Sequence, residues 1–301
     1  MIVGATASGK SAIALEVARR RPGVELVSMD SMALYRGMDI GTAAPTAADR
    51  AEVPHHLLDL VDPTEDFTVS DFQVAAREAL VGMADRGSRA VLVGGTGLHV
   101  RAVVDDLEIP GRYDEVRAAL EADDDTSGLY ARLVALDPVA AGRMEATNRR
   151  RVVRALEVTL GSGRPFSSFG PGLEAYPATP FTQVGLRVDR DVMDRRIAER
   201  YQRQLDDGFL DEVRALEGLV GGLSRSAAQA LGYKELLAHL RGDRTLEDAV
   251  SDAVVATQRF ARRQERWFRR DPRIEWFDVA DDPLEALNEV LERFDRCGAP
   301  G

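Results

Sequence analysis

Gly4–Ser11, with the sequence GATASGKS, is the stretch that decides the fold of this 301-residue chain. It matches the pattern G-x-x-x-x-G-K-[ST], in which backbone N–H groups turn onto a diphosphate, the lysine adds positive charge and the last hydroxyl reaches a Mg²⁺ ion. Apolar residues 1–3 precede it and the helix-like run 12–18 follows it, the strand, loop and helix that the motif requires. A glycine-rich turn can match by chance, but these flanks favour a phosphate-binding loop (P-loop). The predicted diphosphate-binding residues are Gly4, Ala5, Thr6, Ala7, Ser8, Gly9, Lys10 and Ser11, and Ser11 is the predicted metal ligand.

The composition is that of an ordinary globular protein. With 45% hydrophobic and 30% charged residues, 301 residues are enough for a full α/β core and an additional domain. The single cysteine, Cys297, excludes an internal disulfide framework, and neither a leader nor an eighteen-residue apolar run is apparent. We therefore expect a cytoplasmic protein with no membrane partner. The net charge of −11 argues against indiscriminate nucleic-acid binding but does not exclude local basic patches.

The predicted sheet brings a carboxylate toward the P-loop. The three residues before Gly4 are few for a strand, which usually takes about five or six, so we expect the start of the chain to be trimmed or misassigned. The second predicted strand, 24–29, ends at Asp30. Because ligands of open α/β sheets bind beyond the carboxyl ends of the strands, Asp30 is expected to face the same cleft as the P-loop. The alternative is that Asp30 only caps a turn or a helix.

A continuous apolar run at 90–93 predicts a buried strand that ends in Gly94, Gly95 and Thr96. A P-loop ATPase would usually place an acidic residue for Mg²⁺ at this point. Its absence weakens the interpretation as an ATPase, although Asp30 could supply the acid. The glycines permit close backbone approach to a ligand, and Thr96 adds a hydroxyl. The alternative is a tight strand-to-helix turn capped by threonine.

Residues 30–45 are too irregular for a helix and too long for a hairpin turn. Long ordered loops at strand ends are usually functional. A short third strand is predicted near His56, and we interpret His55 and His56 as loop or core residues because they lack His or Cys partners at metal-ligand spacing. An amphipathic helix over 69–83 follows.

After residue 110 the pattern becomes helical, with helices predicted over 114–121, 128–136 and 150–160 and strands only from 181–188 and at 274–277. A helical stretch of about seventy residues between two strands of one sheet indicates an inserted domain. The predicted fold is therefore α/β: a P-loop NTPase-like parallel sheet flanked by helices, over 1–110 and 181–301, with an all-helical insertion over 111–180.

Three helical stretches are predicted around the last strands, over 191–216, 226–240 and 246–268. In the third, Leu246, Val250, Ala253, Phe260, Gln264 and Trp267 are expected along one side. Other faces carry Arg259, Arg262, Arg263, Arg266, Arg269 and Arg270, and a second cluster consists of Asn148, Arg149, Arg150, Arg151 and Arg154. Either cluster alone is typical of a solvated helix face. Two of them on either side of an insertion favour an anionic polymer as partner.

Together these residues resemble the bacterial tRNA dimethylallyltransferase (tRNA isopentenyltransferase) family, which modifies the adenosine next to the anticodon. The resemblance spans nearly the whole chain and rests on the P-loop and on residues 30–45 (DSMALYRGMDIGTAAP), 92–96 (LVGGT), 154–158 (RALEV) and 264–267. The 30–45 block is far more specific than the P-loop. The chain departs from the family at Ala5, Ala33 and Ala44, where proline, glutamine and lysine are usual. These positions concern loop rigidity and tRNA contacts.

The resemblance implies that the P-loop holds the diphosphate of dimethylallyl diphosphate, with Lys10 on the phosphates and Ser11 on Mg²⁺. It implies that Asp30 accepts a proton from N6 of adenosine 37, that Thr96 positions the amine or the bridging oxygen, and that Arg200 stabilises the departing diphosphate. The adenine must flip out of its stack to react, and we expect a monomer. The implied tRNA contacts are Asp30, Ser31, Met32, Ala33, Thr96, Arg117, Arg150, Arg151, Val152, Val153, Arg154, Gln229, Gly232, Tyr233, Lys234, Arg262, Arg263, Gln264, Arg266, Trp267 and Arg269.

Two other classes of protein remain open. A P-loop small-molecule kinase or a nucleotide-level prenyltransferase would share the loop and Mg²⁺ but would need neither the insertion nor the paired arginine clusters. A non-catalytic RNA-binding module would need neither an intact P-loop nor Asp30.

Overall fold

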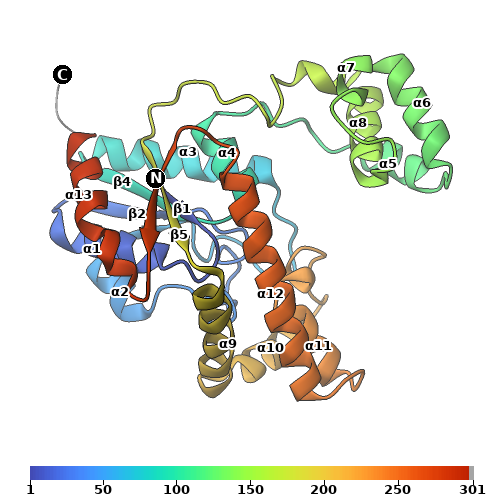
Figure 1. Ribbon diagram of the computed structural model, residues 1–301. Coiled ribbons are helices and arrows are strands. Elements are labelled where there is room, and N and C mark those ends of the chain that lie inside the picture. The colour runs from blue at the N-terminus through green and yellow to red at the C-terminus, as the bar shows by residue number, and fades with distance from the viewer. Residues whose placement is uncertain (298–301) are drawn as a thin grey trace. The chain divides into compact units, whose positions relative to one another are not determined.

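A parallel β-sheet forms the centre of the protein in a computed structural model that describes residues 1–297 (Figure 1). Its strand order is β3-β2-β4-β1-β5-β6, and every neighbouring pair is parallel. The strands are β1 (Ile2–Gly4), β2 (Val24–Ser28), β3 (His55–His56), β4 (Arg89–Gly94), β5 (Gln183–Val188) and β6 (Ile274–Val279). The predicted α/β class and the parallel sheet are confirmed.

Helices and short 3₁₀ turns make up the rest of the regular structure (Figure 1). In the first half of the chain they are α1 (Lys10–Arg20), α2 (Ala47–Glu52), α3 (Val69–Asp85), α4 (Gly97–Val104), α5 (Asp114–Glu121), α6 (Thr126–Leu136), α7 (Pro138–Ala141) and α8 (Arg149–Ser162). The later ones are α9 (Arg190–Asp206), α10 (Phe209–Glu217), α11 (Tyr233–Leu240), α12 (Leu246–Phe268) and α13 (Leu287–Arg296). Short 3₁₀ turns are η1 (Phe166–Ser168), η2 (Ala227–Gln229) and η3 (Pro283–Ala286).

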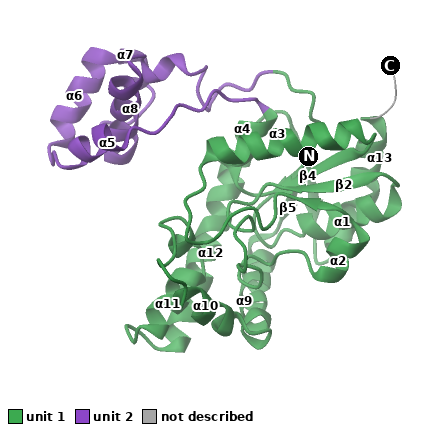
Figure 2. Cartoon of the chain, turned by 180° about the vertical axis from the view of Figure 1, so that it is seen from behind, with its two compact units in different colours: residues 1–104, 178–301 green, residues 105–177 purple. Residues whose placement is uncertain are grey.

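The chain divides into two compact units, one of residues 1–104 with 178–301 and one of residues 105–177 (Figure 2). Each unit has its own hydrophobic core: the first is built around the sheet, the second around α8, where Leu133 and Leu156 are fully buried. The boundaries at 104/105 and 177/178 lie slightly earlier than the predicted 110/111 and 180/181. At this boundary the Thr179 hydroxyl donates a hydrogen bond to the Val104 carbonyl at 2.8 Å.

The three-residue strand β1 is the centre of the sheet despite its length. It pairs with β4 on one side and β5 on the other, so its peptide groups are shared between two ladders. Ile2 and Val3 are buried, as are Val27 and Leu92 on the neighbouring strands. This burial on both faces explains why the strands read as continuous apolar runs.

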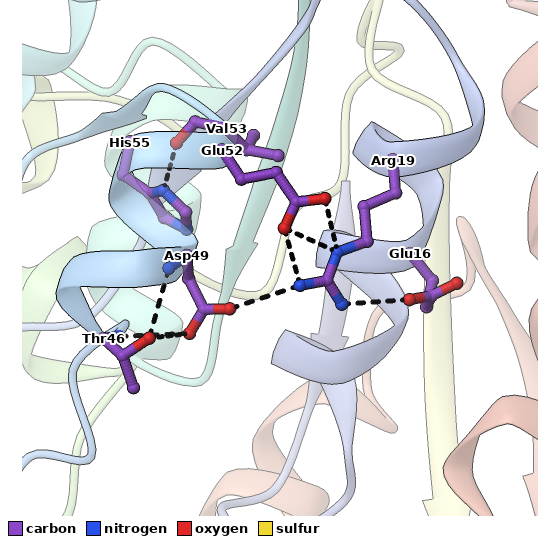
Figure 3. A network of polar contacts seen from close by, with 7 residues as sticks. All are labelled: Glu16, Arg19, Thr46, Asp49, Glu52, Val53 and His55. Carbon is purple, nitrogen blue, oxygen red and sulfur yellow. Dashed lines mark hydrogen bonds and ion pairs between the residues drawn. The ribbon is translucent and has the colours of Figure 1, made fainter.

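The helix α2 is held against α1 by a polar network around Arg19 (Figure 3). Arg19 contacts Glu16 at 3.1 Å, Glu52 at 2.7 Å and Asp49 at 3.5 Å. Thr46 and Asp49 form a capping box that starts α2. His55 accompanies this network, with its Nδ1 at 2.7 Å from the Val53 carbonyl oxygen.

The neighbouring His56 pairs with a buried carboxylate. Its Nε2 lies 2.5 Å from Glu25 Oε2, which Arg86 also contacts at 2.8 Å. Burial alone would raise the pKa of Glu25, but hydrogen bonds from Ser88, Arg86 and His56 lower it to about 2. The structure thus gives both His55 and His56 structural contacts, as the sequence predicted.

Within residues 1–297, no helix is both long and apolar enough to cross a membrane.

Three predicted helical stretches need correction. The stretch 191–216 is two helices, because Gly208 adopts a positive φ of 98° and ends the run between α9 and α10. The stretch 226–240 begins with the 3₁₀ turn η2, and its α-helix α11 starts only after Gly232, where φ is 85°. On α12 the buried stripe is shifted from the predicted one; it consists of Ala249, Ala253, Thr257, Ala261, Gln264 and Phe268. Its small side chains let α9 and α11 pack closely against α12.

Candidate active site

The P-loop between β1 and α1 presents a row of backbone donors. Ala7 and Gly9 have positive φ values of 63° and 89°, which turn successive N–H groups toward one side of the loop. Among the described residues, the N–H groups of Ala7, Gly9, Lys10 and Ser11 have no hydrogen-bond acceptor, and Ser8 Oγ is buried without a partner. Four unpaired donors at a helix N-terminus are typical of an anion-binding site.

Lys10 adds a cation to this row. Its Nζ donates to the Ala5 carbonyl at 3.2 Å, which folds the side chain back over the loop. Burial lowers the pKa of Lys10 to about 8, with Asp30 opposing the shift and Arg200 adding to it. A bound diphosphate would favour the charged form, so the lysine is poised for an anionic ligand.

Arg200 reaches the P-loop from α9. Its Nη1 donates to Thr6 Oγ1 at 2.9 Å, while its Nε is buried with no protein partner among the described residues. Burial lowers the pKa of Arg200, and the nearby Asp30 carboxylate opposes the shift. A buried guanidinium with an unpaired N–H is costly unless an anion completes it.

Asp30 and Thr96 lie side by side at the carboxyl ends of β2 and β4. Oδ1 of Asp30 accepts hydrogen bonds from the backbone N–H groups of Met32 at 2.8 Å and Ala33 at 3.3 Å. The Ser31 N–H donates to Thr96 Oγ1 at 3.3 Å. These contacts fix one carboxylate oxygen of Asp30, and within residues 1–297 its Oδ2 has no protein donor. The Asx turn expected as the alternative is therefore present, and it also orients the carboxylate.

Gly94 lets these two strand ends approach each other. A Cβ at Gly94 would lie 2.4 Å from the Met29 carbonyl oxygen, closer than any side chain could come. The Thr96 N–H donates to that same carbonyl at 3.4 Å. Gly94 is thus required by the packing of β4 on β2, which brings Thr96 beside Asp30.

Gln264 and Trp267, both predicted to contact tRNA, pack instead against this site. Gln264 is 7% exposed; its Oε1 accepts from the Thr6 N–H and its Nε2 donates to the Gly95 carbonyl, both at 2.8 Å. Trp267 lies against Gly97, where a Cβ would come within 2.2 Å of the indole Nε1. Buried Gln264 presents almost no surface to an RNA.

Other predicted tRNA contacts are also buried in unit 1. Ala33 is 5% exposed, and Tyr233 is 1% exposed with its hydroxyl donating to Glu212 Oε1 at 2.6 Å. Burial and the Glu212 carboxylate both raise the pKa of Tyr233. Gly232 is buried against Phe209. Gln229 and Lys234 are exposed, so these two side chains, unlike those of Ala33 and Tyr233, are accessible to a partner.

In the second unit, two predicted tRNA contacts form an internal ion cluster. Glu157 is completely buried and is contacted by Arg154 at 2.6 Å and by Arg117 at 3.4 Å. The side chains of Val152 and Val153 belong to the hydrophobic core, which corrects their prediction as contacts. Arg150 and Arg151 are exposed. Arg151 lines a surface hollow together with Asn148, from the same predicted cluster, and Arg143, which was not predicted because it stands apart from that cluster in the sequence.

Among the predicted tRNA-contacting arginines of α12 and its C-cap, some form ion pairs with neighbouring carboxylates and others are exposed without such a pair among the described residues. Arg262 pairs with Asp194 of α9 at 3.1 Å and Arg269 with Glu265 at 2.6 Å. Arg263 and Arg266 are exposed. Arg196 was not a predicted site residue, yet it donates to the Ala7 carbonyl at 3.2 Å and so supports the P-loop from α9.

The donor set for a metal ion is small. Ser11 is exposed at the start of α1, where its hydroxyl can be a ligand. Within the part of the chain that the structure describes, no group of three His, Cys, Asp or Glu side chains is placed to hold an ion. Such a set fits Mg²⁺, which is usually held by few protein ligands together with substrate phosphates.

The parallel sheet carries a P-loop at its central strand, Arg200 donates a hydrogen bond to this loop, and a backbone amide orients the carboxylate of Asp30. Together with the comparisons, these features define a P-loop transferase. The IPP transferase family model matches residues 33–271, and the chain belongs to this family.

Named relatives and solved structures agree. The tRNA dimethylallyltransferase of Pseudarthrobacter chlorophenolicus is 48% identical over 288 residues, covering 95% of both chains. The crystal structure of the tRNA isopentenylpyrophosphate transferase from Bacillus halodurans is 36% identical with a TM-score of 0.71, covering 98% of this chain and 95% of that one. The Staphylococcus epidermidis tRNA isopentenylpyrophosphate transferase is 29% identical with a TM-score of 0.69, covering 98% of each chain.

Proposed function

We propose that this chain transfers a dimethylallyl group from dimethylallyl diphosphate to N6 of adenosine 37 of tRNA, next to the anticodon, and releases diphosphate. The observation that carries the proposal is the pairing of an anion site, formed by the P-loop and Arg200, with the oriented carboxylate of Asp30. Membership in the IPP transferase family and the names of the relatives support the choice of donor and acceptor.

The P-loop and Arg200 bind the leaving group. Lys10 and the unpaired N–H groups of the loop contact the phosphates, and Arg200 Nε supplies a donor that the protein leaves unused. As the C1–O bond breaks, negative charge grows on the bridging oxygen of the diphosphate. Fixed donors aimed at this charge stabilise the transition state more than the ground state.

Asp30 accepts the proton that the N6 amine loses. The N6 nitrogen attacks C1, the N6–C1 bond forms, and one N6 proton passes to Asp30 while the electrons of the C1–O bond leave with the diphosphate. Because Oδ1 is held by two backbone amides, Oδ2 is the oxygen available to accept it. Thr96, beside Ser31, positions the amine or the bridging oxygen.

Prenyl transfer in this family generally needs a divalent metal ion, which we infer to be Mg²⁺ held by Ser11 and the diphosphate. When bound there, such an ion would neutralise part of the phosphate charge. The target adenine must leave its stack to reach Asp30. The exposed side chains of Arg150, Arg151, Lys234, Arg263 and Arg266 are the best candidates for contacts with the phosphate backbone. Since the acceptor is tRNA, we expect the chain to act in the cytoplasm, as a monomer.

Purified protein incubated with unmodified tRNA, Mg²⁺ and dimethylallyl diphosphate should yield a tRNA whose digested nucleosides include a dimethylallyl adenosine, identified by its mass. The control replaces the donor with ATP. ATP hydrolysis without an isoprenoid on tRNA would instead indicate a P-loop kinase or ATPase. Prenylation of free AMP but not of tRNA would indicate a nucleotide-level prenyltransferase.

A further inference from the structure

The side chain of Gln264 joins two parts of the active site that are far apart in the sequence. Its Oε1 accepts a hydrogen bond from the Thr6 N–H, and its Nε2 donates one to the Gly95 carbonyl, each at 2.8 Å. Gln264 is 7% exposed, so water does not compete for either bond. Through this residue, α12 ties the P-loop to the turn that carries Thr96.

A primary amide of this length suits both partners. Glutamate would place a second acceptor against the Gly95 carbonyl, asparagine is one methylene shorter, and an apolar side chain would leave both backbone groups unpaired. The turn itself cannot fill the space, because a Cβ at Gly95 would lie 2.4 Å from Gln264 Nε2. The contact is therefore specific in chemistry and in shape.

The bond also decides which P-loop amides are left for a ligand. The Thr6 N–H is taken by Gln264, while within residues 1–297 those of Ala7, Gly9, Lys10 and Ser11 have no acceptor. The Thr6 hydroxyl accepts from Arg200 at the same time. Thr6 is thus held from α12 through its backbone and from α9 through its side chain, which aims the rest of the loop at the anion.

We propose that Gln264 is a positioning residue for the diphosphate: it holds the P-loop and the Gly95–Thr96 turn at their working separation and makes no contact with tRNA. The proposal rests on the proposed function for the identity of the donor, and on the structure alone for the effect on diphosphate. It assigns Gln264 to donor binding, in place of the acceptor contact that the family resemblance implies.

The test compares Gln264→Met, which removes both bonds, with Gln264→Glu, which keeps the acceptor for Thr6. The matched control is Gln204→Met, since Gln204 is another buried glutamine whose Nε2 donates to backbone carbonyls, those of Ile40 and Gly41, away from the P-loop. Calorimetry with inorganic diphosphate and Mg²⁺ measures the anion site, and fluorescence anisotropy measures tRNA binding. Melting temperature reports the purely structural cost.

Gln264→Met should weaken diphosphate binding about tenfold, because the P-loop amides lose their fixed orientation, and raise the KM for dimethylallyl diphosphate similarly, with the tRNA Kd within about twofold of the parent. Gln204→Met should lower the melting temperature and leave diphosphate affinity unchanged. Weaker tRNA binding with parental diphosphate affinity would overturn the proposal. If Gln264→Met fails to fold, parental diphosphate affinity in Gln264→Glu would overturn it equally. A parent protein that binds diphosphate but prenylates no tRNA refutes the proposed function and leaves this comparison intact.

Discussion

The guanidinium of Arg200 donates a hydrogen bond to the hydroxyl of Thr6, so that α9 reaches into the P-loop and leaves a second guanidinium N–H unpaired beside it. The Thr6 hydroxyl anchors Arg200 to the loop, and the Nε of Arg200 keeps a donor without a protein acceptor among the described residues. Arg200, which belongs to a helix far along the chain, is thereby fixed beside the P-loop of residues 4–11.

Replacing Arg200 should impair the chemical step. Arg200→Lys loses the fork that serves Thr6 and an anion together, so we expect kcat to fall about 100-fold or more, the scale for one lost transition-state donor. The tRNA affinity should stay near the parental value. The matched control is Arg203→Lys, at an exposed position one turn along α9. Single-turnover prenylation gives the rate, and parental kcat in Arg200→Lys would contradict the assignment.

Asp30→Asn tests the proton acceptor. The amide oxygen can still accept from Met32 and Ala33, so the loop should fold as before, while the basic oxygen is lost. We expect turnover to drop at least about 100-fold with tRNA affinity nearly intact. Asp39→Asn, an exposed change in the same loop, is the control. Near-normal turnover in Asp30→Asn would show that another group takes the proton.

The lowered pKa of Lys10 predicts a pH effect on donor binding. Lys10 is charged below its folded pKa of about 8 and neutral above it, so kcat/KM for dimethylallyl diphosphate should fall as pH rises through 8. Because the folded pKa lies below the ordinary 10.5, the buried charge destabilises the free protein below pH 8. Lys10→Met should therefore melt at a higher temperature at pH 7 while losing diphosphate binding. A flat profile up to pH 10 would contradict this.

The exposed arginines of α12 should govern the salt dependence of tRNA binding. Changing Arg263 and Arg266 to glutamine should weaken tRNA binding at low salt and reduce the slope of log K against log salt, by about one for each lost phosphate contact. Anisotropy titrations over a series of salt concentrations measure the slope. Glutamine at Arg20 and Arg187, which are exposed elsewhere, makes the same change in net charge. Equal slopes in the two double variants would show that the exposed arginines of α12 do not contact the phosphates and only form a solvated helix face.

Glu157 supports the helical unit from within. Glu157→Gln leaves Arg154 and Arg117 facing a neutral side chain in a buried place, and we expect it to cost about 2 kcal/mol of unfolding free energy. The exposed Glu121→Gln, which also contacts Arg117, should cost far less. Urea denaturation followed by circular dichroism measures both, and equal costs would contradict an internal role for the cluster.

Local patterns in the sequence predicted the sheet, the P-loop and the insertion, because strand burial, motif spacing and helical periodicity are properties of short segments. The contacts of single side chains could not be predicted in this way. Glu157 draws Arg154 and Arg117 inward only once α5 and α8 pack together, and no spacing in the sequence shows that. The break at Gly208 had a visible signal, since glycine often ends a helix, but apolar periodicity continues across it.

The hydrogen bond between Thr179 and Val104 shows that the polypeptide leaves the sheet unit and returns to it at adjacent points. The helical unit of residues 105–177 is therefore an insertion whose two ends lie close together. Evolution can lengthen, shorten or exchange such a segment without shifting the register of a single strand, since the two ends that must be joined already touch. The helical unit and the catalytic centre can in this way change in sequence independently of each other.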